Sequence, residues 1–144
     1  PFYCDHTEGD EPYDIKSLGL VSNEELTVLV QKAKVLINSS LCEAGCGSGL
    51  DAWTLETPTA ISNIPPYLEQ VEKLGVKTEF FNPRNSEDIA RAVLKLLDNP
   101  TLAGQNAKIS KEALDNYTWE DVAKQYMEIF KKEINCDTGN YVRL

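Results

Sequence analysis

A glycine-rich segment carries two carboxylates eight residues apart, Glu43 and Asp51, with Gly45, Gly47 and Gly49 between them. Glycine lets a backbone come close to a ligand and adopt positive φ angles. The N–H groups that open a helix attract anions, because they have no partner inside the helix and the helix dipole is positive there. Glycines followed by the start of a helix therefore predict a phosphate-binding loop with an acid on either side.

The elements on both sides of this segment must position it. The apolar run at residues 35–37 is typical of a buried strand in a parallel sheet, and a helical pattern begins near Gly49. A loop that joins a strand to a following helix lies at the C-terminal end of the strand, where sheets of this kind bind ligands. We therefore expect Asp51 in the first turn of the helix and both acids beside one pocket.

Composition restricts the class of protein. The chain has 144 residues, enough for one domain with its own core, and its 42% of hydrophobic residues fits a globular fold. A net charge of −9 argues against nucleic acid as a partner, because nucleic-acid-binding proteins carry a basic face. Neither a long apolar run nor a signal peptide is present, so membrane association is not indicated. The chain begins with Pro1 rather than Met, which fits a fragment of a longer protein.

The cysteines do not form a pattern that predicts disulfides or a metal site. Cys4, Cys42, Cys46 and Cys136 are irregularly spaced, and His6 is the one histidine. A structural zinc site needs four ligands in close groups, so no metal is expected. A Cys–His nucleophile is disfavoured because no histidine lies near the paired cysteines. Reduced thiols in a cytoplasmic protein are the expectation.

Strand and helix patterns alternate along most of the chain, which predicts an α/β fold. The strongest helical pattern follows Asn85, because apolar residues recur there at helical spacing. We expect strands at 15–21, 35–37, 59–62 and 78–81, and helices that begin near residues 22, 50, 65, 85, 101 and 119. Trp119 and Tyr126 are expected in the core, on the packing face of the last helix. The fold class is therefore a Rossmann-like parallel sheet flanked by helices.

Five blocks of residues, in order along the chain, resemble one known family. They are 18–25, 40–52, 58–69, 81–90 and 117–120. Together they resemble the C-terminal, donor-binding half of retaining glycosyltransferases of the GT-B fold, the glycosyl transferases group 1 family. The signature of that family is a Glu, seven residues and a second Glu, which stand here as Glu43 and Asp51. The resemblance covers about residues 15–133.

The chain departs from the family pattern at several positions. Asp51 replaces the second Glu, the pair Gly45-Cys46 replaces an aromatic residue and a glycine, and Glu56 replaces a glycine. The Arg and Lys that neutralise the donor diphosphate in the family have no counterpart. The resemblance therefore implies an incomplete domain at 15–134, between a loop segment at 1–14 and an unstructured tail at 135–144.

The resemblance also implies a role for each candidate residue. Glu43 would be the catalytic residue beside the donor sugar, and Asp51 would accept hydrogen bonds from the ribose hydroxyls. The donor would be a UDP- or GDP-sugar, used without a metal cofactor for the retaining transfer of a hexose. The acceptor would bind to an N-terminal domain of the same protein, and this chain alone would be inactive. The other donor-binding residues would be Gly45, Cys46, Gly47, Ser48 and Asn63.

Alternatives remain open for the residues and for the whole chain. The glycine segment could be a loop without a ligand, Glu43 could cap the following helix, and Asp51 could be an acid in the first helical turn that the helix dipole stabilises. The altered signature also fits a catalytically degenerate α/β domain used for protein association. A third hypothesis is an isomerase or epimerase that acts on nucleotide sugars.

Overall fold

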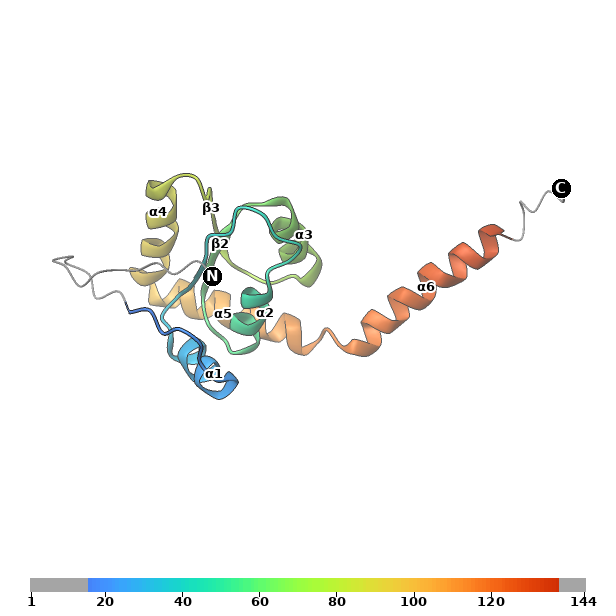
Figure 1. Cartoon of the computed structure of the whole chain (residues 1–144), viewed down its shortest axis with the longest axis horizontal. Helices are drawn as coiled ribbons and strands as arrows, with labels where there is room; N and C mark the ends of the chain where they lie inside the picture. Colours follow the sequence, from blue (N-terminus) through green and yellow to red (C-terminus); the bar gives the residue numbers. More distant parts are fainter. Residues whose placement is uncertain (1–15, 138–144) are drawn as a thin grey trace.

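The computed structural model describes residues 16–137 and arranges them as an α/β body with one long projecting helix (Figure 1). The strands are short and the helices account for most of the regular structure. The elements, in chain order, are α1 (Asn23–Lys32), β1 (Leu36–Asn38), α2 (Gly47–Thr54), β2 (Thr59–Ser62), α3 (Pro65–Leu74), β3 (Glu79–Phe81), α4 (Ser86–Leu97), α5 (Pro100–Asp115) and α6 (Trp119–Asp137).

The three strands form one parallel sheet in the order β1-β2-β3. Ile37 lies opposite Ala60, and Ile61 lies opposite Phe80. Parallel neighbours require a crossover connection, and α2 and α3 supply the two crossovers. The predicted Rossmann-like α/β class is therefore confirmed.

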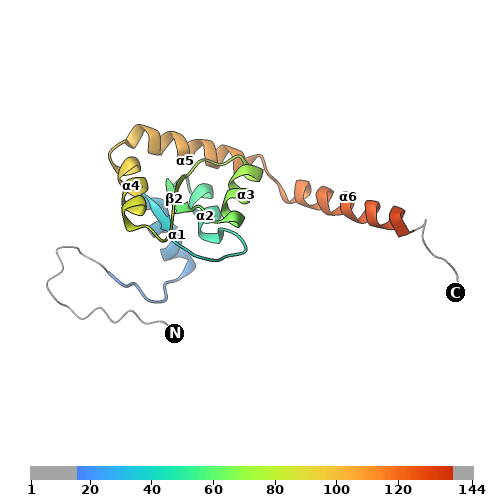
Figure 2. The same cartoon turned by 90° about the horizontal axis from the view of Figure 1, so that it is seen from above.

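The central strand β2 is buried along its whole length and contributes to a core on each face of the sheet. On one face, Ile61 packs with Trp53 of α2 and Tyr67 of α3. On the other face, Ala60 packs with residues of α4 and α5 in a second cluster. Figures 1 and 2 show α4 on one side of the strands and α3 on the other, while α5 runs along the body from α4 toward α3. The C-terminal half of α5 therefore packs against the first cluster, through Ala113 and Leu114. Side-chain alternation along a strand produces these two cores.

Several helix boundaries lie where the local signals predict them. Ser22 and Glu25 form a reciprocal capping box at the start of α1. The side chain of Asn85 caps α4 by accepting from two backbone N–H groups. Gly75 ends α3 in the left-handed conformation, with φ of 71°. These contacts join residues close in sequence, so the sequence alone identifies them.

The predicted strand at 15–21 is wrong for the residues that are described. Residues 16–21 form no regular element, and Gly19 adopts a φ of 61° that interrupts an extended run. Residue 15 and the predicted loop at 1–14 lie outside the described residues. At the other end, α6 continues to Asp137 and so overlaps the predicted tail, whose remaining residues also lie outside the described part.

The prediction that Trp119 and Tyr126 are core residues is also wrong. Their side chains are 88% and 56% exposed, because α6 projects beyond α5 and away from the sheet (Figures 1 and 2). Phe130 and Ile134 lie on the same helix and are also exposed. Helical periodicity identifies an apolar face, but it does not specify whether another element covers that face. No helix within residues 16–137 is both long and apolar enough to cross a bilayer.

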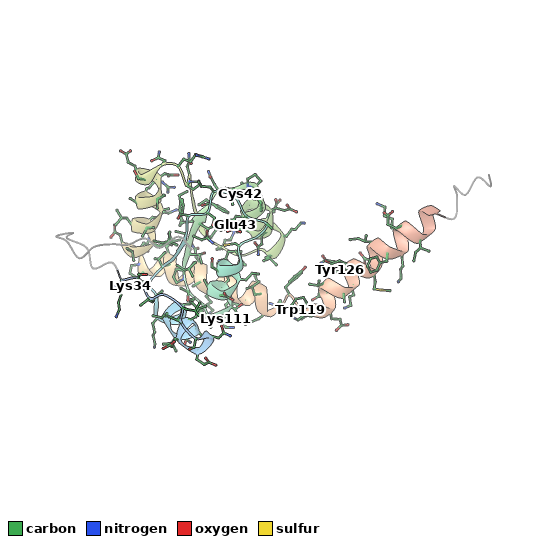
Figure 3. All side chains as sticks on the ribbon, viewed as in Figure 1. Lys34, Cys42, Glu43, Lys111, Trp119 and Tyr126 are labelled. Carbon is green, nitrogen blue, oxygen red and sulfur yellow. The ribbon has the colours of Figure 1, made fainter. Side chains whose placement is uncertain are left out.

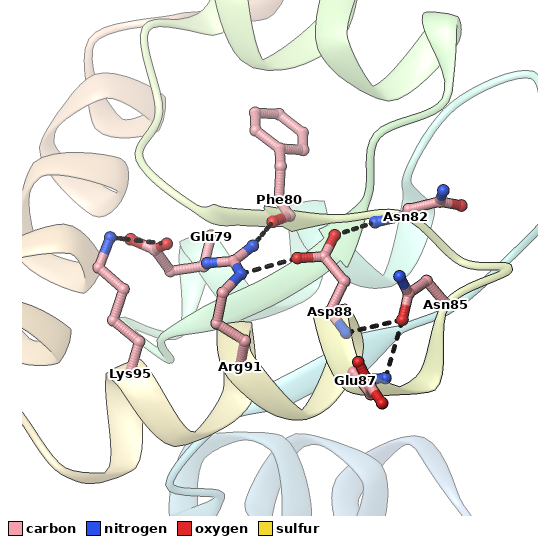
Figure 4. A network of polar contacts seen from close by, with 8 residues as sticks. All are labelled: Glu79, Phe80, Asn82, Asn85, Glu87, Asp88, Arg91 and Lys95. Atoms are coloured by element: carbon pink, nitrogen blue, oxygen red, sulfur yellow. Dashed lines mark hydrogen bonds and ion pairs between the residues drawn. The ribbon is translucent and has the colours of Figure 1, made fainter.

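A polar network fastens α4 to the C-terminal end of β3 (Figure 4). Asp88 accepts from the Asn82 N–H at 2.7 Å and from Arg91 Nε at 2.7 Å. Arg91 also donates to the Phe80 carbonyl at 3.0 Å. The Asn82 N–H and the Arg91 guanidinium hold the pKa of Asp88 below its usual value. This network lies at the C-terminal end of the sheet, where the glycine segment also follows β1.

Candidate functional site

The glycine segment connects β1 to α2 at the C-terminal end of the sheet, as the sequence predicts. The helix begins at Gly47, earlier than expected, with the buried Cys46 as its N-cap residue. Among the described residues, no side-chain oxygen caps this helix. Of the first-turn N–H groups, that of Gly47 donates to the Gly45 carbonyl at 3.2 Å. Those of Ser48 and Gly49 are not taken up by a side-chain oxygen among the described residues, and such N–H groups are what an anion-binding helix start requires.

Glu43 lies on the loop before α2, next to Cys42 and on the side of α3 (Figure 3). Its side chain is exposed, and its Oε1 accepts from the Ser40 hydroxyl at 3.1 Å. The alternative in which Glu43 caps the following helix is wrong, because the cap residue is Cys46 and carries no side-chain cap bond. The bond to Ser40 restrains one carboxylate oxygen and leaves the group accessible to solvent.

Asp51 lies in the second turn of α2, not in the first turn as expected, because the helix starts at Gly47. Its alternative role as a first-turn acid is therefore also wrong. The side chain is exposed and lines a hollow of about 310 Å³ together with residues of α1. The α1 residues of this hollow are Asn23, Leu26, Thr27 and Val30. Asp51 thus faces the space between α1 and α2.

Asn38, the last residue of β1, is the centre of the hydrogen bonds in the site. Its Oδ1 accepts from the Ser40 N–H at 3.1 Å and from the Tyr67 hydroxyl at 3.2 Å. Its Nδ2 donates to the Ser48 Oγ at 2.8 Å and lies 3.8 Å from the Cys46 sulfur. Neither Asn38 nor Tyr67 is among the site residues predicted from the sequence. The signal available in the sequence was a polar residue that directly follows an apolar run typical of a strand. The prediction that this run is buried is wrong, because β1 is an edge strand of the described sheet and Ile37 is 49% exposed.

α3 holds the glycine segment from the other side. Gln70 Oε1 accepts from the Cys46 N–H at 2.6 Å. A Cβ on Gly45 would lie 3.3 Å from the same oxygen. The absence of a side chain at position 45 therefore leaves room for the bond between Gln70 and the Cys46 N–H. Gln70 is a further site residue that the sequence does not predict.

Cys46 is buried and packs against Trp53, Ile61 and Tyr67. Burial raises the pKa of its thiol, against the opposing effect of hydrogen bonds from Gly49 and neighbouring side chains. A thiol with a raised pKa is protonated at neutral pH and is a poor nucleophile. Cys46 therefore shapes the loop through packing. Within the described residues, no group of three His, Cys, Asp or Glu side chains could hold a metal ion.

A larger groove of about 640 Å³ lies on the α3 side of the loop. Ala44 and Gly45 line it together with α3 residues and with Tyr117 and Trp119. Glu69 also lines it and pairs with Lys73 at 2.6 Å, which lowers the pKa of Glu69. Glu69 is exposed, as a solvated helix-face residue would be.

Asn63 follows β2 and lies exposed at the same end of the sheet. Its N–H donates to the Phe81 carbonyl at 2.9 Å. The structure thus places the predicted residues on three segments: Glu43 on the loop, Ser48 and Asp51 on α2, and Asn63 after β2. Asp51 lines the hollow beside α1 and Glu43 does not, so this hollow does not bring the two acids together as expected. Among these residues, Ser48 is connected to the end of β1 by the hydrogen bond that it accepts from Asn38.

Comparisons with known proteins agree with this architecture. The family model for glycosyl transferases group 1 matches residues 12–133. The chain is 26% identical over 117 residues to the MMP alpha-(1->4)-mannosyltransferase of Mycolicibacterium hassiacum. This alignment includes 79% of the chain and 28% of the relative, so the chain spans less than a third of that protein's length. The family match extends over most of the chain, and we conclude that the chain belongs to the glycosyl transferases group 1 family.

Proposed function

We propose that this chain is part of the donor-binding domain of a GT-B glycosyltransferase, which transfers a hexose from a UDP- or GDP-sugar with retention of configuration. The observation that carries the proposal is the start of α2. It lacks a side-chain oxygen cap among the described residues, follows a strand of a parallel sheet and stands next to a loop with an accessible carboxylate. An anionic diphosphate is the ligand that suits a helix start of this kind.

The chemistry of transfer assigns a task to each part of the site. Cleavage of the bond between sugar and diphosphate leaves negative charge on the diphosphate and positive charge on the sugar ring. Backbone donors and the Ser48 hydroxyl at the start of α2 would stabilise the departing diphosphate. Glu43, as an accessible carboxylate, would face the sugar. Asp51 would accept hydrogen bonds from the ribose hydroxyls in the hollow beside α1.

The acceptor would bind to an N-terminal domain of the same protein, and this chain alone would not catalyse transfer. The alignment covers 28% of the mannosyltransferase, which supports the proposal that donor and acceptor bind to different domains. The name of that relative makes a mannosyl donor a sensible first choice for testing. A cytoplasmic location and a reaction without a metal cofactor are further parts of the proposal.

Titration calorimetry tests donor binding. The chain is titrated with UDP, GDP, UDP-glucose and GDP-mannose to millimolar concentration, and the wild type is compared with Asp51→Asn. We expect one nucleotide to bind. Asp51→Asn should weaken the binding of that nucleotide about tenfold, because the ribose hydroxyls lose a charged acceptor. Asp115→Asn, on the exposed face of α5, is the matched control and should leave binding unchanged. Absence of binding by all four ligands contradicts the proposal.

Transfer itself is tested in the full-length protein that contains this chain. With donor and acceptor present, Glu43→Gln should lower transfer at least about a hundredfold, whereas Glu24→Gln on α1 should not. Analysis of the donor at the end of the reaction separates transfer from isomerisation or epimerisation, since these rearrange the sugar without an acceptor.

A second candidate function, a non-catalytic domain for protein association, is favoured by one observation. The apolar face of α6, which includes Tyr126, Phe130 and Ile134, is exposed. Full-length protein that forms a stable complex, but neither transfers sugar nor hydrolyses donor, would support this alternative.

A further inference from the structure

We propose that Asn38 is a positioning residue that commits the Ser48 hydroxyl to donate its proton to a diphosphate, and that Tyr67 holds Asn38 in the required orientation. The inference deepens the proposed function and rests on it. It concerns three residues from β1, α2 and α3 that meet at the start of α2.

The orientation of the Asn38 amide follows from its partners. The Ser40 N–H can only donate, so the atom that faces it at 3.1 Å must be the amide oxygen. The Tyr67 hydroxyl donates to the same oxygen at 3.2 Å. The amide nitrogen is therefore directed toward Ser48 Oγ, at 2.8 Å. Ser62 donates to the Asn38 carbonyl at 3.2 Å and restrains the backbone of the same residue.

The donor direction at Ser48 follows from that geometry. An amide nitrogen only donates, so Ser48 Oγ must be the acceptor of the Asn38 bond. The Ser48 proton is then free to be donated elsewhere. The neighbouring Cys46 thiol is a weak acceptor, and an anionic phosphate oxygen would compete with it successfully. Ser48 is exposed at the start of α2, where such an oxygen would bind.

The absence of charge on the Asn38 side chain is also required for Ser48 to donate to an anion. A carboxylate at position 38 would have nearly the same shape and could still accept from Ser40 and Tyr67. It would also accept the Ser48 proton and would place a negative charge beside the helix start. Asn38→Asp therefore keeps the bonds that position 38 accepts from Ser40 and Tyr67, but it makes Ser48 the donor of the bond between positions 38 and 48. This variant separates a role in anion binding from a purely structural role.

The binding test uses the whole chain and inorganic pyrophosphate, with UDP and GDP in parallel titrations. We expect Ser48→Ala and Asn38→Asp each to weaken pyrophosphate binding about ten- to a hundredfold, the effect of one hydrogen bond to a charged group. Ser48→Thr, which keeps the hydroxyl, should bind within about twofold of the wild type. Tyr67→Phe should weaken binding about two- to threefold, and Tyr126→Phe on exposed α6 should have no effect.

Amide hydrogen exchange at Ser40 measures the bond between the Ser40 N–H and Asn38 Oδ1 without any ligand. The Ser40 N–H should be protected in the wild type and in Asn38→Asp, and should lose protection in Asn38→Leu, which has no acceptor. Wild-type affinity in Asn38→Asp or Ser48→Ala would overturn the inference while leaving the proposed function intact. Failure of the wild type to bind pyrophosphate, UDP and GDP would overturn both. An unprotected Ser40 N–H in the wild type would overturn the role of Asn38 alone.

Discussion

Cys46 and Gln70 are 24 residues apart in sequence, yet the backbone N–H of Cys46 donates to Gln70 Oε1 at 2.6 Å. The bond ties the glycine segment to α3 immediately before α2 begins. Because Cys46 is the N-cap residue of α2, the position of the helix start depends on a side chain from a later helix. The phosphate-binding geometry proposed for this loop is therefore a tertiary property.

Replacement of Gln70 by Met tests this link. Met has a similar length but offers no strong acceptor, so the Cys46 N–H loses its partner. We expect the free energy of unfolding to fall by about 1–2 kcal/mol in urea titrations and the Cys46 amide to exchange faster. Gln105→Met, at an exposed position on α5, is the control and should change stability by less than about 0.5 kcal/mol. Equal effects of the two substitutions would contradict the role of Gln70.

Gly49→Ala should destabilise the protein although it adds a better helix former to α2. A Cβ at position 49 would lie 2.6 Å from the Cys46 sulfur and 3.1 Å from the Trp53 ring, both buried. Overpacking of this kind costs about 1–3 kcal/mol. Gly104→Ala in α5 meets no atom within 4 Å and should instead stabilise by about 0.5–1 kcal/mol. Urea unfolding of both variants measures the contrast, and a stabilised Gly49→Ala would refute the predicted clash.

The Asp88 network predicts a specific dependence of stability on pH. The folded state lowers the pKa of Asp88 through the Asn82 N–H and the Arg91 guanidinium. Its contribution is therefore present above the unfolded pKa of 3.8 and is lost as the pH falls through the lower folded value. Asn at this position cannot become charged.

Asp88→Asn should accordingly reduce stability at neutral pH and flatten the loss of stability below about pH 4. Unfolding by urea at a series of pH values measures both effects. Asp98→Asn, which follows α4 and also removes one carboxylate, is the control and should not reproduce the loss of stability at neutral pH. A wild-type acid profile in Asp88→Asn would show that the network does not contribute.

The position of α6 outside the body predicts that its aromatic residues contribute little to the stability of this chain. Phe130 is 54% exposed, whereas Phe81 in β3 is 1% exposed. Phe130→Ser should change the free energy of unfolding by less than about 0.5 kcal/mol, but Phe81→Ala should lower it by about 3–5 kcal/mol. Thermal and urea unfolding provide the comparison. A large loss in Phe130→Ser would mean that α6 packs against the body.

The sequence by itself determined the elements whose signals are local. Helix caps act within three or four residues, as Ser22 and Glu25 or Asn85 and Asp88 do, and the apolar run at residues 35–37 identifies β1 without reference to any partner. Such contacts recur in many proteins with the same geometry, so residue types and spacing are enough to predict them. The α/β class followed from the alternation of these elements.

Only the tertiary structure decided how the site is held and which faces are covered. Asn38 meets Tyr67 from 29 residues away and Cys46 meets Gln70 from 24, and neither separation follows from a local pattern. The same limit explains the error at Trp119, since an amphipathic helix has the same sequence pattern whether or not another element covers it. Contacts between distant residues depend on the packing of the sheet and its helices, and that packing brings Asn38, Ser48 and Tyr67 together.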